Sequence, residues 1–119
     1  MKQFRFLDWK VYKDSQKLFS LLLQIVKGLP REYRYELGSQ LLRSGLSITL
    51  NIAEGSGKQS EKELNRFIET ALGSSYETLA NIDTLKSNDL VSEKDFLTVR
   101  SMITDICNQL GGFKKKLDL

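Results

Sequence analysis

The chain has 119 residues, with 18 Lys and Arg against 15 Asp and Glu, a formal net charge of +3. This length fits one domain over residues 1–119 with one hydrophobic core, and so mild a positive charge permits nucleic-acid binding without indicating it. Because there is no histidine and only one cysteine, Cys107, the usual zinc site, histidine-based catalysis and an intrachain disulfide are excluded, and we expect neither a metal nor another cofactor.

Residues 8–27 are predicted to form the first helix. Val11, Leu18 and Leu22 recur at helical spacing on an apolar side. Gly28 followed by Pro30 is typical of a helix end. Residues 1–8 lack the apolar segment of a signal peptide, and the longest apolar runs are too short to cross a bilayer. We therefore expect a cytoplasmic protein with no membrane partner.

The second helix is predicted to begin near residues 31–35 and to end at Glu54. At about 100° per residue it carries two opposed apolar stripes, whereas an ordinary surface helix has one. A domain core can cover only one stripe, so another surface must cover the second. The predicted core stripe is Leu37, Leu41, Ile48 and Ile52. The predicted oligomer interface is Leu42, Leu46, Leu50 and Ala53.

A polar line separates the two stripes on one side of this helix. Buried amides and hydroxyls need partners, because an unpaired group costs about 1–3 kcal/mol. A ladder between helices would pair them and set the register, whereas a ligand-binding groove is the alternative; we favour the ladder. The line consists of Gln40, Arg43, Ser47, Asn51 and Glu54, and the other gap holds only the small residues Gly38, Gly45 and Thr49.

Two further helices follow. Gly55 and Gly57 are expected to allow a left-handed helix end and a tight turn. Ser60, three residues before Glu63, predicts the cap of a helix that continues to Lys86. Ser92, three residues before Asp95, predicts the cap of the last helix. Its apolar stripe reaches Leu117 across Gly111 and Gly112, where we expect fraying because each glycine costs about 1 kcal/mol.

Four helices of similar length with short connections favour an all-α fold, an antiparallel up-down-up-down four-helix bundle. Lysines and arginines near its ends could contact RNA or DNA, particularly if several subunits combine their fields. A solvated turn and a helix-dipole contact are the alternatives for them. These possible contacts are Arg31, Arg34, Lys58, Lys62, Arg66, Lys114, Lys115 and Lys116.

Catalysis finds little support in the sequence. Glu54, Glu63 and Glu77 are the only sensible carboxylates for a Mg²⁺-dependent RNA-processing site. No nucleophile, metal motif or cofactor motif accompanies them, so we predict a protein that is not an enzyme. A protein-binding adaptor without nucleic acid is the other alternative.

Several motifs extend over nearly the whole chain. They are Tyr35-x-Leu37, Gln40-Leu-x-x-Ser44, Ser47-Ile48, Asn51-Ile-Ala-Glu-Gly55, Ser60-x-Lys62-Glu63-x-x-Arg66-Phe67 and Ala71-x-Gly73-Ser74-x-x-Glu77. With them the sequence resembles the four-helix-bundle proteins encoded in intervening sequences of bacterial large-subunit ribosomal RNA genes. It is also similar to the accessory variability proteins of diversity-generating retroelements.

The resemblance implies an all-helical protomer that assembles into a ring, commonly a homopentamer. The retroelement relatives bind nucleic acid and a reverse transcriptase through positive surface, and this chain departs from them by its small charge excess. We therefore expect a non-catalytic oligomeric scaffold, a pentamer of this chain. We expect it to bind RNA or DNA weakly or together with a partner such as a nucleic-acid enzyme.

Overall fold

The computed structural model describes residues 3–117, which contain helices and turns and no strand. The prediction of an all-helical protein is therefore confirmed. A short 3-10 helix, η1 (Arg5–Asp8), leads into the first long helix. The remaining helices are α1 (Lys10–Gly28), α2 (Arg31–Arg34), α3 (Glu36–Ser56), α4 (Glu61–Ser87) and α5 (Glu93–Leu117).

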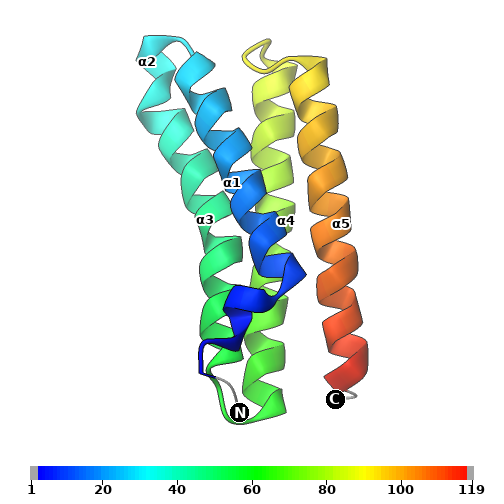
Figure 1. Ribbon diagram of the computed structural model, residues 1–119. Helices are drawn as coiled ribbons and strands as arrows, with labels where there is room; N and C mark the ends of the chain where they lie inside the picture. Colours follow the sequence, from blue (N-terminus) through cyan, green and yellow to red (C-terminus); the bar gives the residue numbers. More distant parts are fainter. Residues whose placement is uncertain (1–2, 118–119) are drawn as a thin grey trace.

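The four long helices lie side by side and are joined at alternating ends (Figure 1). Helix α1 contacts α3 and α5, and α4 contacts the same two helices. The order around the unit is therefore α1, α3, α4, α5, which places the α1/α3 face opposite the α4/α5 face. At one end of this 46 × 22 × 19 Å unit lie η1, the α3–α4 turn and the end of α5, and at the other lie α2 and the α4–α5 turn.

Large apolar side chains from all four long helices fill the core. Leu41, Ile48 and Ile52 of the predicted core stripe are buried, but Leu37 is 37% exposed. Leu37 lies in the first turn of α3, at the margin of the core, so its assignment to the buried stripe was wrong. The fully buried aliphatic residues include Leu18, Leu22, Leu29, Leu41, Ile48, Ile82, Val99 and Ile106.

Two predicted helices differ from the structure, the first in where it begins and the second in being divided. Trp9 is extended between η1 and α1, so the first long helix begins at Lys10 instead of residue 8. Tyr35 separates α2 from α3. Both predicted caps are confirmed, because the backbone N–H of Glu63 donates to Ser60 Oγ and that of Asp95 donates to Ser92 Oγ, each at 3.1 Å.

The expected left-handed end of α3 is wrong. No glycine in residues 3–117 has a positive φ, and Gly57 has a φ of −88°. Gly55 is instead buried within the helix, where an added Cβ would lie 2.8 Å from Phe67 Cβ and 3.2 Å from Leu64 Cδ1. Its role is to let α3 and α4 approach closely. Helix α5 also runs through Gly111 and Gly112 without interruption.

A polar cluster joins α1 to α5. Asp14 Oδ2 accepts hydrogen bonds from Lys10 Nζ at 2.6 Å and from Gln109 Nε2 at 2.8 Å. The bond from Lys10 is the main reason that the pKa of Asp14 lies below its ordinary value. Trp9 packs on Phe113 with a ring separation of 4.8 Å in the same interface. These contacts hold the end of α5 beside the start of α1.

We predict opposite effects for alanine at two helical glycines. Gly55→Ala should lower the unfolding free energy by about 1–2 kcal/mol, since its Cβ would collide with Phe67. Gly73→Ala, with open space around the added atom, should raise it by up to about 1 kcal/mol through helix propensity. Urea unfolding of both variants would measure this, and equal changes would contradict the role given to Gly55.

Candidate assembly face and basic end

Helix α3 carries large apolar side chains on its outer side. Leu46 is 41% and Leu50 is 55% exposed, while Leu42 and Ala53 are half-buried. We name Leu42, Leu46 and Leu50 the leucine ridge. Phe19 from α1 lies near this helix, 3.8 Å from a Cβ built on Gly45. Because the inner side of α3 is already packed in the core, the ridge is a second apolar surface on the same helix.

The predicted polar line divides into two parts. Ser47 reaches α4, because its Oγ lies 2.8 Å from Ser74 Oγ, and Asn51 Nδ2 supports it from within α3 by donating to Ser47 Oγ at 3.0 Å. Gln40, Arg43 and Glu54 are exposed instead. The line is thus no continuous groove, and only its Ser47–Asn51 part joins two helices.

A second set of hydroxyls between α3 and α4 was missed from the sequence. Ser44 Oγ donates to the Leu41 carbonyl at 2.9 Å and lies 3.0 Å from Thr78 Oγ1. Asn81 Nδ2 donates to the same Ser44 oxygen at 3.2 Å. Ser44 and Thr78 are buried, so these bonds fix the axial position of α3 against α4. The Gln40-Leu-x-x-Ser44 motif contained the first of these hydroxyls, but their partner could not be read from one helix.

The gap of small residues on α3 faces α1. Thr49 Oγ1 donates to Ser15 Oγ at 3.0 Å, and both residues are buried. A Cβ on Gly45 would overlap Leu22 Cδ1, and one on Gly38 would lie 2.7 Å from Val26 Cγ1. Small residues therefore bring α1 and α3 into close contact, as hydroxyls and Gly55 do for α3 and α4.

Most of the predicted nucleic-acid contacts lie at one end of the unit. The α3–α4 turn and the first turns of α4 hold Lys58, Lys62 and Arg66, and the end of α5 holds Lys114, Lys115 and Lys116; we call these six residues the basic end (Figure 1). Lys114 Nζ lies 3.6 Å from Glu69 Oε2, which joins the two helices there.

The aromatic ring of Phe67 orders two of these cations. The Lys58 ammonium lies 5.1 Å from the ring centre and the Arg66 guanidinium 5.3 Å.

Arg31 and Arg34 lie at the opposite end, in α2. Arg34 there donates to the Leu29 carbonyl at 3.1 Å, which holds α2 against the end of α1.

The three candidate catalytic carboxylates are spread over the unit. Glu54 is near the end of α3, Glu63 is in the first turn of α4, and Glu77 is about four turns, or roughly 21 Å, further along α4. Within residues 3–117 no group of three His, Cys, Asp or Glu side chains is placed to hold a metal ion. The structure does not bring these carboxylates into one site.

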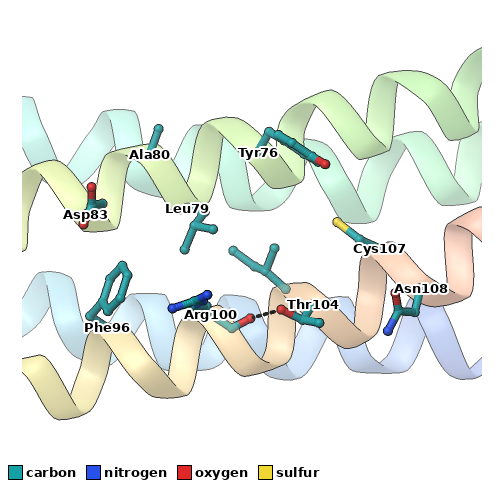
Figure 2. Close-up of a pocket in the computed structure, with 10 residues that line it drawn as sticks. Tyr76, Leu79, Ala80, Asp83, Phe96, Arg100, Thr104, Cys107 and Asn108 are labelled. Carbon is teal, nitrogen blue, oxygen red and sulfur yellow. Dashed lines mark hydrogen bonds between the residues drawn. The ribbon is translucent and has the colours of Figure 1, made fainter.

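Figure 2 shows a feature that the sequence analysis did not identify, a groove of about 650 Å³ between α4 and α5. Leu79, Phe96 and Ile103 supply apolar lining, and Asp83 of α4 and Arg100 of α5 lie on opposite sides of the groove. Cys107 lies at the other end, where burial raises the pKa of its thiol. Finding this groove requires the relative positions of two helices.

These helices define a small all-α protein with an exposed apolar ridge. Residues 7–112 match the 23S rRNA-intervening sequence protein family, so the chain belongs to that family and the resemblance drawn from its motifs is confirmed. It is also similar to a crystal structure of a protein of unknown function from the S23 ribosomal protein family of Bacteroides thetaiotaomicron.

That structure aligns with a TM-score of 0.78 and 24% identity over 84% of this chain and 94% of the other, which shows a shared fold. No curated protein matches the chain. Of the helices in residues 3–117, none is both long and apolar enough to cross a membrane.

We predict that Ser44→Ala lowers the unfolding free energy by about 1 kcal/mol, because Asn81 loses its acceptor and Thr78 loses one of its two partners. Gln40→Ala, at an exposed position of the polar line on the same helix, should change it by less than about 0.5 kcal/mol. Thermal or urea unfolding compares the two. Equal effects would show that the buried hydroxyls do not stabilise the α3–α4 contact.

Proposed function

We propose that the protein is a non-catalytic scaffold whose protomer is an up-down-up-down four-helix bundle and whose working form is a ring of identical chains, a homopentamer. We further propose that this ring binds the phosphate backbone of RNA or DNA weakly or with the help of a protein partner. The observation that carries the proposal is the leucine ridge, which lies on the same helix as a complete core face.

Burial of the ridge would provide the driving force for assembly. Large exposed apolar patches on soluble proteins commonly mark interaction sites, and transfer of apolar area from water contributes about 25 cal/mol per Å². The half-buried Phe19, beside Gly45, and the 37% exposed Leu23 extend the apolar surface onto α1. A second copy of the chain would supply an apolar surface to cover the ridge without requiring another protein.

The basic end supports the nucleic-acid part of the proposal. One subunit carries only a small charge excess, and Glu61, Glu63 and Glu69 lie near the same lysines. Rotation about an axis parallel to the helices would place the basic end of every subunit on one rim. The combined rim would attract a phosphate backbone more strongly than one subunit can, and would do so in a salt-dependent way.

We predict that Leu50→Glu separates the assembly into monomers that keep the helical fold, since the new charge would be buried only in the interface. Leu97→Glu is the matched control, because Leu97 is 49% exposed on α5, and it should leave the assembly intact. Sedimentation velocity at micromolar concentration measures the mass, and circular dichroism measures the fold.

Two results would count against the assembly. A monomeric wild-type protein would contradict it directly. An unchanged oligomer mass in Leu50→Glu would remove the ridge from the interface.

We predict that RNA or DNA binding by the assembled protein weakens steeply with salt. Replacing Lys114, Lys115 and Lys116 by glutamine should make the plot of the log binding constant against log salt less steep. Its slope should fall in magnitude by about 2 for each subunit that contacts the nucleic acid. The control, Lys13, Lys17 and Lys27 replaced by glutamine, makes the same change of net charge on exposed positions of α1. Fluorescence anisotropy at several salt concentrations measures both. No binding at low salt would favour a protein-binding adaptor.

A further inference from the structure

We infer that the groove between α4 and α5 is the seat for the leucine ridge of a second copy of this chain, so that subunits join head to tail. The inference rests on the proposed assembly and specifies which surface meets the ridge. The groove has an apolar floor that includes Leu79, Phe96 and Ile103, and its volume of about 650 Å³ can take side chains from a neighbouring helix.

The two surfaces lie on opposite faces of the unit. The ridge and Phe19 belong to the α1/α3 face, whereas Figure 2 views the groove with α4 and α5 in front and α3 and α1 behind them. An interface formed by two different surfaces of the same chain is heterologous, and repeated rotation about one axis can close it into a ring. A ridge that packed against its own copy would leave the groove uncovered.

The ridge and the groove also lie at the same height along the helices. A rotation about an axis parallel to the helices preserves height, so this agreement is a requirement for a closed ring. The Ser47–Ser74 bond places Leu46 near the level of Tyr76, which lines the groove. The Cys107 thiol lies beside Ser75, which follows Ser74 directly in the chain, so this cysteine is near the same level. Leu46 would thus reach a neighbour's groove beside Cys107.

The charged residues beside the ridge and the groove support the same relative orientation of the two copies. When the α1/α3 face of one copy meets the α4/α5 face of the next in this orientation, α3 lies against α4. Arg43, beside the ridge, makes no ion pair or side-chain hydrogen bond among the residues the structure describes, and it would face the α4 side of the groove. Asp83 and Glu77 are exposed carboxylates on that helix, and the ion pair of Asp83 with Lys86 is long, at 3.9 Å.

The cysteine in the groove provides a direct test. Leu46→Cys should form a disulfide with Cys107 of the neighbouring copy when the assembled protein is oxidised with copper phenanthroline. Because each subunit then links to two neighbours, a denaturing gel should show a ladder that extends beyond the dimer. The ladder should disappear in the double variant Leu46→Cys/Cys107→Ser. Leu97→Cys, which keeps Cys107 but places the new thiol outside the groove, should give no ladder.

The mass of each variant before oxidation separates the possible failures. A wild-type monomer would overturn the proposed assembly and the docking together. An assembled protein whose cross-linking stops at a dimer and persists without Cys107 would show that the ridge packs against another ridge. Leu50 is the ridge position one turn away from Leu46. If the protein assembles but neither Leu46→Cys nor Leu50→Cys gives cross-links, the groove is excluded as the surface that receives the ridge. In both of the last two results the proposed assembly stands and this inference fails.

Discussion

The close approach of α3 to two neighbouring helices determines where its large side chains can go. Towards α1 the contact is made by Gly38, Gly45 and the Thr49–Ser15 hydrogen bond. Towards α4 it is made by hydroxyls and by Gly55. Close-packed interiors leave no room for leucines on those sides. Leu46 and Leu50 therefore point outward, and the helix that is most tightly held within the chain is also the one that exposes an apolar ridge.

Hydroxyl pairs also fix the axial position of α3 relative to its neighbours. Apolar surfaces can slide past one another at moderate cost, whereas a buried hydroxyl that loses its partner is penalised at once. The bonds of Ser44 and Ser47 to α4 hold α3 at one axial setting. That setting decides the height of the ridge relative to the groove, so in the proposed assembly interactions inside one copy would control the geometry between copies.

The sequence predicts the helices well because their signals are local. Helical spacing of apolar residues and the Ser60 and Ser92 caps need only neighbours in the chain. The pairing of Ser44 with Thr78 joins residues 34 positions apart, and no pattern within either helix specifies it. Gly55 was assigned to a turn because glycine serves both turns and close helix contacts, and only the position of Phe67 distinguishes them. The groove likewise depends on how α4 and α5 are set side by side.

The separation of ridge and groove onto opposite faces gives each subunit a direction. In a head-to-tail assembly, a copy with a damaged ridge can still receive a neighbour in its groove, but it offers nothing to the next copy. Such a subunit ends the chain that it joins and prevents closure. A closed ring has one more interface than an open chain with the same number of subunits. That last interface forms at a high effective concentration, because its two surfaces already belong to one assembly. A minority of defective copies would therefore inactivate normal ones, which is the behaviour of a dominant-negative allele.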